Sequence, residues 1–274
     1  MTIDLSRRNL LAGAAALGLA GTATAAVAWP WQKPFKKVGV QLYSVRVALQ
    51  ADPLGTLQKV RAIGFDEVET AGLAGKTAKE FRGLLDRVGL KAPSSHIGYD
   101  DWVNRPEAAL DDVAALGGEY AVLAWLAPDL RNGWVARAKQ LNGFAALAKA
   151  RGLKFAYHNH NFEFIKSDEG LPYHLLLENT DPELVAFELD CYWASFMSHD
   201  PVEILHEHGA RIRMLHLKDK AKDGQIATVG QGVIDFAKVL KAGKAAGVAH
   251  VFVEHDNAAD PFASITQSLK YLRG

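Results

Sequence analysis

The phrase Ala62-Ile63-Gly64-Phe65 closes an amphipathic segment and opens a short apolar run, and it decides the fold. A glycine in the left-handed conformation ends a helix, and the apolar residue after it starts the next strand. Close variants of the phrase recur at residues 87–90, 150–153 and 245–248, and Gly117 and Gly209 also follow amphipathic segments. We therefore expect helices and parallel strands to alternate along the chain.

Eight short apolar runs fit this alternation, separated by longer segments with helical spacing. The expected strands are residues 38–43, 67–70, 91–96, 120–125, 154–158, 185–190, 212–217 and 250–254. The expected helices include residues 54–63, 77–88, 106–116, 134–150, 173–179, 201–208 and 236–246. Eight such units in roughly 250 residues predict an α/β fold with one domain, the (β/α)8 or TIM barrel. The alternative is an open doubly wound sheet, but no strand precedes a Gly-x-Gly-x-x-Gly sequence.

The N-terminal residues have a different composition. Arg7 and Arg8 precede residues 9–32, which carry no charged side chain and are rich in Ala, Gly and Leu. This arrangement resembles a twin-arginine signal, and Ala23-Thr24-Ala25 supplies the small residues of a cleavage site. A membrane anchor is the alternative, but Gly, Thr and Pro make a poor transmembrane helix. We expect residues 1–25 to be a signal peptide and residues 26–274 to be a periplasmic barrel domain without stable membrane insertion.

Charge and cysteine content restrict the partners. Lys plus Arg and Asp plus Glu both number 31 among 274 residues, so the formal net charge is zero. A neutral chain does not collect phosphates, and we expect no nucleic-acid partner. The single cysteine, Cys191, excludes an intramolecular disulfide and a Cys-based zinc site. A metal would therefore need histidine and carboxylate ligands. The sequence leaves the oligomeric state open.

Polar residues stand where the active site of a TIM barrel forms, at the C-terminal ends of the strands. Asp190, His216 and Glu254 end the sixth, seventh and eighth expected strands. Two carboxylates and an imidazole from neighbouring strands suit a divalent cation such as Mn²⁺, Zn²⁺, Co²⁺ or Mg²⁺. The alternative is that they only pair internally, Asp190 with His216 and Glu254 with Lys218.

The fourth metal ligand could be either Glu163 or His158. Glu163 lies beyond the fifth strand and would fold back over the mouth, where a carboxylate suits a hard cation, so it is favoured. His158 and His160 share one strand face and are candidate bases, because imidazole titrates near neutral pH. Glu254 is the alternative base, and Lys218 is a candidate acid.

Further candidates concern substrate binding. Tyr43, Trp125 and Trp193 lie at or just past strand ends and offer flat platforms for the apolar faces of a sugar. His96 ends the third strand and is a candidate both for substrate contact and for the second acid. The expected partner is a small-molecule sugar or keto-glycoside.

The strand endings together resemble one family. They read HNHNFEF at 158–164, ELDCYW at 188–193, HLKD at 216–219 and VEHD at 253–256, after an early GVQLYSVR at 39–46. This order is similar to that of the sugar phosphate isomerase/epimerase family, the xylose isomerase-like barrels that share a superfamily with AP endonuclease family 2. The resemblance implies a divalent metal held by Glu, Asp, His and Glu from strands 5 to 8, and chemistry that moves a proton next to a carbonyl.

The sequence departs from the family pattern at two points. His158 stands where many members place the strand-5 glutamate, and Trp193 and Lys222 replace the His and Arg with which ketose epimerases clasp substrate. We expect a metal-dependent isomerase or epimerase acting on a keto-sugar. The alternatives are a lyase or dehydratase acting on 3-keto-glycosides or inososes, a phosphodiester endonuclease, which the zero net charge disfavours, and a non-catalytic sugar-binding barrel.

Overall fold

Eight parallel strands close into a barrel in the computed structural model, which describes residues 34–274. The strands are β1 (Gly39–Gln41), β2 (Glu67–Thr70), β3 (Lys91–Ile97), β4 (Tyr120–Leu123), β5 (Lys154–His158), β6 (Val185–Asp190), β7 (Ile212–Leu217) and β10 (His250–Val253). Each strand pairs with its neighbours in sequence, and β1 closes the ring by pairing with both β2 and β10. The predicted TIM barrel is confirmed, whereas the predicted signal segment lies outside the described residues.

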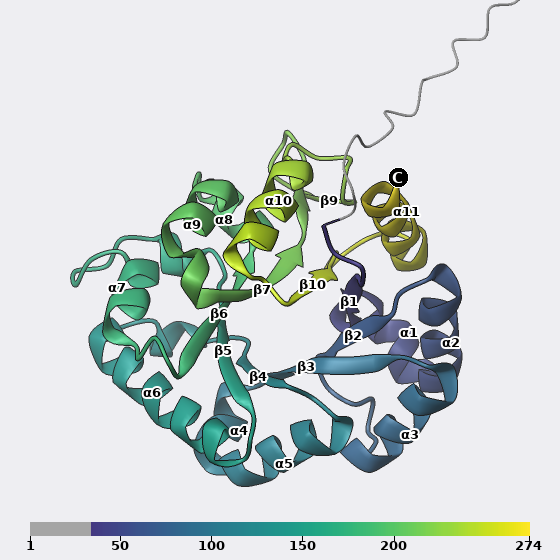
Figure 1. Cartoon of the computed structure of the whole chain (residues 1–274), viewed down its shortest axis with the longest axis horizontal. Helices are drawn as coiled ribbons and strands as arrows, with labels where there is room; N and C mark the ends of the chain where they lie inside the picture. Colours follow the sequence, from purple (N-terminus) through teal and green to yellow (C-terminus); the bar gives the residue numbers. More distant parts are fainter. Residues whose placement is uncertain (1–33) are drawn as a thin grey trace, which may run out of the picture. The chain divides into compact units, whose positions relative to one another are not determined.

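Helices surround the barrel (Figure 1). They are α1 (Arg46–Ala51), α2 (Pro53–Ile63), α3 (Ala78–Val88), α4 (Tyr99–Asn104), α5 (Pro106–Leu116), α6 (Trp134–Ala150), α7 (Pro172–Asn179), α8 (Cys191–Phe196), α9 (Pro201–His208), α10 (Phe236–Ala246) and α11 (Pro261–Arg273). Short 3-10 turns cover Leu42–Val45, Pro128–Leu130, Phe162–Phe164 and Gly209–Arg211. A small antiparallel hairpin, β8 (Asp219–Lys220) with β9 (Ile226–Ala227), follows β7. No helix among the described residues is long and apolar enough to cross a membrane.

The helix ends follow the signals in the sequence with one exception. Thr77 and Glu80 form a reciprocal capping box at the start of α3. Glycines with positive φ follow the ends of five helices, at positions 64, 89, 117, 152 and 247. Gly209 differs, because its φ is −56° and it starts a 3-10 turn. A Cβ at Gly209 would lie 2.6 Å from the Cβ of Ala246, so close helix packing explains this glycine.

Two strands are shorter than expected by two residues or more, and β10 is shorter by one residue, Glu254. The run 38–43 yields only Gly39–Gln41, because the Gln41 side chain accepts a hydrogen bond from the Tyr43 backbone N–H and starts a 3-10 turn. The run 120–125 ends at Leu123, which leaves Trp125 in the loop. Both changes place the aromatic side chains of Tyr43 and Trp125 in loops after the strands.

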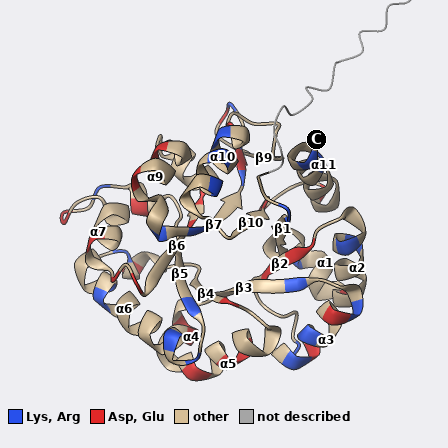
Figure 2. Ribbon diagram, in the orientation of Figure 1, with Lys and Arg blue, Asp and Glu red and all other residues tan. Residues whose placement is uncertain are grey.

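Apolar side chains fill the space between the strands and the helices, in one large cluster that includes Val40, Phe65 and Leu215. A smaller cluster lies around Tyr120, Met214 and Phe252. Figure 2 shows acidic and basic residues interspersed around the outer helices. Buried charged groups therefore stand out, and they concentrate on the strands.

Candidate active site

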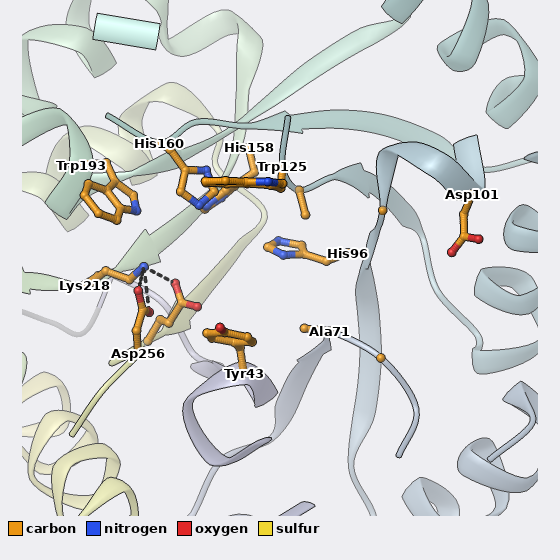
Figure 3. A pocket seen from close by; sticks show the side chains of 14 residues that line it. Tyr43, Ala71, His96, Asp101, Trp125, His158, His160, Trp193, Lys218 and Asp256 are labelled. Carbon is orange, nitrogen blue, oxygen red and sulfur yellow. Dashed lines mark hydrogen bonds and ion pairs between the residues drawn. The ribbon is translucent and has the colours of Figure 1, made fainter. Parts of the chain in front are cut away.

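A cavity of about 680 Å³ opens at the C-terminal ends of the barrel strands (Figure 3). Most residues that the sequence singled out line it: Tyr43, His96, Trp125, His158, His160, Trp193, Lys218 and Glu254. Tyr43 and Trp125 are 42% and 47% exposed, as expected of open platforms for a ligand. His160 packs edge-on against Trp125, with ring centroids 4.9 Å apart. The cavity brings together the predicted substrate contacts and the predicted acid and base groups.

Asp190, His216 and Glu254 form a group at this end of the barrel, which we call the mouth triad. One ligand atom from each residue lies within 4.8 Å of the other two. The Nδ1 atom of His216 is 2.9 Å from Glu254 Oε2 and 3.9 Å from Asp190 Oδ2. Asp190 and His216 are fully buried, and Glu254 is 5% exposed. The expected convergence of these three side chains is present.

Local structure fixes the position of Asp190. Its Oδ1 accepts the backbone N–H of Trp193 and caps α8, so only Oδ2 faces the triad. Its backbone N–H donates to Asn159 Oδ1 from the end of β5. These two contacts tie the ends of β5 and β6 together and hold the Asp190 carboxylate toward the triad.

Lys218 lies between the carboxylates of the mouth. Its Nζ is 2.7 Å from Glu254 Oε2, 3.0 Å from Asp256 Oδ1 and 3.3 Å from Asp190 Oδ2. Burial alone would lower the pKa of Lys218, but these three carboxylates outweigh it and raise the pKa well above its ordinary value. Lys218 is therefore a protonated group that can act as an acid.

His158, the last residue of β5, and His160, just past it, have lowered pKa values. Burial lowers the pKa of His158, and the charge of His216 adds to that effect. Burial, His158 and Lys218 hold the pKa of His160 well below its ordinary value. Both imidazoles are neutral at pH 7 and can accept a proton.

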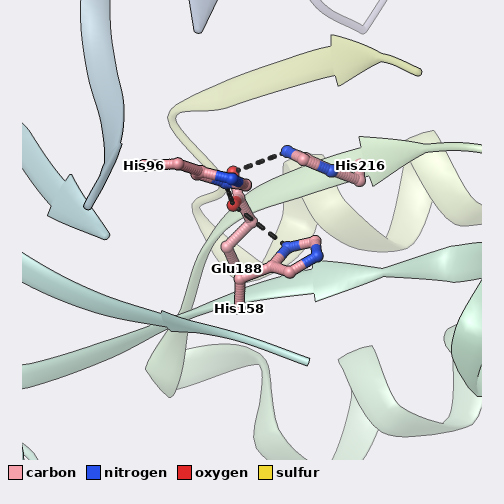
Figure 4. A group of neighbouring side chains, drawn as sticks. All are labelled: His96, His158, Glu188 and His216. Atoms are coloured by element: carbon pink, nitrogen blue, oxygen red, sulfur yellow. Dashed lines mark hydrogen bonds and ion pairs between the residues drawn. The ribbon is translucent and has the colours of Figure 1, made fainter. Parts of the chain in front are cut away.

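A second group of polar side chains lies further inside the barrel, and we call it the deep cluster: Glu69, His96, His158, Glu188 and His216. Figure 4 shows all of them except Glu69. Glu188 Oε2 is 2.9 Å from His96 Nε2 and 3.2 Å from His158 Nδ1. Glu69 Oε2 is 2.6 Å from His216 Nε2. The imidazole of His216 therefore contacts the mouth triad through Nδ1 and the deep cluster through Nε2.

Glu163 does not join the mouth triad, and the expectation that it folds back over the mouth is corrected. Its Oε1 accepts the Tyr157 hydroxyl at 2.6 Å, and its Oε2 accepts the His160 backbone N–H at 2.8 Å. Burial raises the pKa of Glu163 to about 7. The carboxylate braces the turn after β5. His158 is the residue of this strand that reaches the ligand groups.

Sequence reasoning overlooked Glu69, Glu188 and Asp256. Glu188 and Asp190 are two residues apart on β6, so the alternation of a strand places both on the same face. The same rule places Glu67 and Glu69 on one face of β2, a strand whose four residues are all buried. Asp256 lies just past β10 and contacts Lys218. A charged residue inside a predicted buried strand was the available signal.

The donor set fits a divalent cation. Asp190 Oδ2 is buried and has no hydrogen-bond partner, although it faces His216 and Lys218. An unsatisfied buried carboxylate oxygen costs free energy that a cation would recover. Two carboxylates and an imidazole are ligands that Mn²⁺, Co²⁺ and Zn²⁺ accept.

Comparison with known proteins agrees with this architecture. A model of the family "xylose isomerase-like TIM barrel" matches residues 57–274. An inosose dehydratase from Geobacillus thermodenitrificans is 33% identical over 155 residues, which cover 48% of this chain and 51% of that protein. A second, from Geobacillus kaustophilus, is 25% identical over 228 residues, covering 67% and 73%. The chain thus spans about half the length of the first of these relatives.

A solved structure is also similar. The crystal structure of a sugar phosphate isomerase/epimerase from Parabacteroides distasonis matches with a TM-score of 0.76 and 27% identity. The match covers 86% of this chain and 97% of that structure. The likeness therefore extends over nearly the whole barrel.

Proposed function

Because the chain belongs to the family of xylose isomerase-like TIM barrels, we propose that it is a metal-dependent carbohydrate enzyme that removes a proton next to a carbonyl. The observation that carries this proposal is the mouth triad, whose Glu254 lines a sugar-sized cavity beside Lys218. The resident metal is a divalent cation held by Asp190, His216 and Glu254, with Mn²⁺, Co²⁺ or Zn²⁺ the best matches to the ligands.

The substrate we propose is a keto-sugar, in particular an inosose or a 3-keto-glycoside. The relatives named inosose dehydratase support a substrate with a ring carbonyl and a leaving group on a nearby carbon. The exposed rings of Tyr43 and Trp125 offer surfaces on which the apolar face of such a ring can stack.

The side chains supply the proton movements. His158 and His160 are neutral and line the cavity, so either can take the proton from the carbon next to the carbonyl. Glu254 is ionised and is the alternative base. Lys218 is protonated and can deliver a proton to a departing oxygen. A bound cation supplies Lewis-acid stabilisation of the negative charge that develops on the carbonyl oxygen.

The fate of the carbanion separates two outcomes. Return of a proton to the opposite face of the same carbon gives epimerisation, and its delivery to the former carbonyl carbon gives isomerisation. Loss of an oxygen substituent from the carbon on the other side gives dehydration or lysis. We propose elimination as the main outcome, because Lys218 presents a proton to the cavity and the relatives are named as dehydratases. The epimerase outcome shares the first step and the same residues.

The test incubates Mn²⁺-loaded protein with inososes, 3-keto-glycosides and free ketoses in D₂O. We expect release of water or of the aglycone. We also expect deuterium at the carbon next to the carbonyl in recovered substrate, where proton removal has reversed. Deuterium without release would identify an epimerase. Neither signal with any substrate, in a protein that holds its cation, would contradict the proposal and favour a sugar-binding barrel.

We also propose export through the twin-arginine route to the periplasm. The support is the Arg7-Arg8 pair before the uncharged residues 9–32. In cells, replacing both arginines by lysine should keep the protein out of the periplasm, and the wild-type periplasmic form should begin near Ala26. An unchanged distribution would contradict the proposal.

A further inference from the structure

The deep cluster contains two buried carboxylates without a lysine or arginine partner. Among the described residues, the ion-pair partners of Glu69 and Glu188 are all imidazoles: His96, His158 and His216. Both carboxylates are fully buried. The mouth triad differs, because Lys218 already contacts Asp190 and Glu254 there. Buried carboxylates of this kind need a counter-charge.

Two atoms of the deep cluster have no hydrogen-bond partner. They are Nδ1 of His158 and Oε1 of Glu188, both buried. His158 Nδ1 lies 3.2 Å from Glu188 Oε2, and Glu188 Oε1 lies 3.3 Å from His216 Nε2, without hydrogen-bond geometry. Figure 4 shows Glu188 lying between the imidazole rings of His96, His158 and His216.

The spacing of these atoms matches a coordination shell. One ligand atom from each of His96, His158, Glu188 and His216 lies within 4.8 Å of the others. Adjacent ligands about an ion with bonds of about 2.1 Å stand about 3 Å apart. Glu188 Oε2 lies 2.9 Å from His96 Nε2 and 3.2 Å from His158 Nδ1, and Glu188 Oε1 lies 3.3 Å from His216 Nε2, so both carboxylate oxygens stand at about that spacing.

We propose that the deep cluster is a second cation position, held by His96, His158, Glu188 and the Nε2 atom of His216. Three imidazoles and a carboxylate select a first-row transition ion such as Zn²⁺, Co²⁺ or Mn²⁺ over Mg²⁺, which prefers oxygen ligands. Glu69 is a further candidate ligand, because Gln41 and Ser94 hold its carboxylate beside Nε2 of His96 and of His216, and a nitrogen that binds an ion has no proton to donate to it.

His216 links the two positions. Its Nδ1 atom faces the mouth triad and its Nε2 atom faces the deep cluster. A neutral imidazole binds an ion through one nitrogen, so occupation of both positions removes the remaining ring proton to solvent and leaves a bridging imidazolate. The position does not depend on which reaction the mouth performs.

The test counts ions and ligands on the full chain, first stripped of metal and then loaded with Co²⁺ or Mn²⁺. We expect two equivalents of cation per chain after removal of excess. Asp190→Asn should lose one equivalent, and the ion that remains should show three imidazole nitrogens by X-ray absorption or pulsed EPR. His158→Gln should lose the other equivalent and leave an ion with a single imidazole.

Glu188→Gln, which keeps the size of the side chain, provides a second variant if His158→Gln does not fold, and thermal unfolding checks both. If the chain binds a single equivalent of cation through one imidazole, and neither variant changes this, the proposal is overturned. Imidazolium ions would then be the counter-charge of Glu69 and Glu188. The ion count needs no turnover. A chain with two ions and no deuterium exchange would contradict only the proposed reaction, and exchange with one ion would contradict only the deep site.

Discussion

Asp190 and His216 are register partners on the adjacent parallel strands β6 and β7, and their side chains approach to 3.9 Å between Oδ2 and Nδ1. The pairing of the two strand ends, and not proximity in sequence, brings a carboxylate and an imidazole to one point. Glu254 reaches the same point from just beyond β10, the next strand of the barrel. The site is therefore a product of barrel closure.

Asp190→Asn should weaken Mn²⁺ binding at the mouth by more than roughly 100-fold, because the amide removes a charged ligand from a buried site. Titration calorimetry on metal-depleted protein measures the change. Glu163→Gln is the matched control and should leave Mn²⁺ affinity unchanged, since Glu163 contacts Tyr157 and His160 instead. Loss of affinity in the control would restore Glu163 as a ligand.

Lys218→Met removes the only ammonium group that contacts Asp190 and Glu254 within residues 34–274. The metal-free variant should lose about 3–5 kcal/mol of unfolding free energy, because removal of one partner leaves buried carboxylates unpaired. Turnover should fall by about 10²–10⁴-fold if Lys218 is the acid. Urea unfolding and initial rates give the two values. Full activity in Lys218→Met would exclude Lys218 as the acid.

The opposite end of the barrel contains a pH-dependent contact between Glu67 and His250, 2.8 Å apart. Burial opposes the charge on both side chains. Hydrogen bonds from His250 and Lys37 nevertheless lower the pKa of Glu67 below 4.5. Glu67 and Glu119 raise the pKa of His250 above 6.5. The Glu67 contribution is complete above pH 4.5 and is lost as pH falls through its lowered pKa. The His250 contribution is complete below pH 6.5 and is lost as pH rises through its raised pKa.

His250→Gln should therefore cost most between pH 4.5 and 6.5, by roughly 1.5–3 kcal/mol for a hydrogen bond between charged groups. The cost should shrink at higher pH. Urea unfolding across pH measures it, with the exposed His206→Gln as control. A cost that stays constant up to pH 10 would show that the contact is not a charged pair.

Asp219, on β8, organises the loop between β9 and α10. Its carboxylate accepts backbone N–H groups from Gly230 and Gly232 at 2.9 Å and from Ile234 at 3.2 Å. Asp219→Asn should lower the unfolding free energy by about 1–3 kcal/mol, because an amide nitrogen cannot accept these bonds. Faster proteolysis within residues 228–235, measured by mass spectrometry, should accompany the loss. Wild-type proteolysis and stability would contradict this role.

The sequence predicted the barrel because each helix end and strand is a local pattern. The bounds of β2, β5, β6 and β7 agree with those expected, and the glycine phrase located the helix ends. Gly209 was misread because helix packing, which no local pattern reveals, decides its conformation. The last helix, α11, was not predicted.

The site was predicted less completely than the fold. Asp190, His216 and Glu254 end their strands and were visible for that reason, although their role as ligands stays a prediction. Glu163 was favoured by its chemistry alone, and only its hydrogen bonds in the folded chain exclude it from the mouth. Glu69 acts across the barrel from His216, a contact that depends on closure of the sheet.

The most direct test of the central claim is the anomalous scattering of crystals of Mn²⁺-loaded protein, recorded near the manganese absorption edge. We expect an anomalous-difference peak in contact with Asp190, His216 and Glu254, beside Lys218. No peak at the mouth under saturating Mn²⁺, in crystals in which the three side chains keep the positions described here, would contradict it.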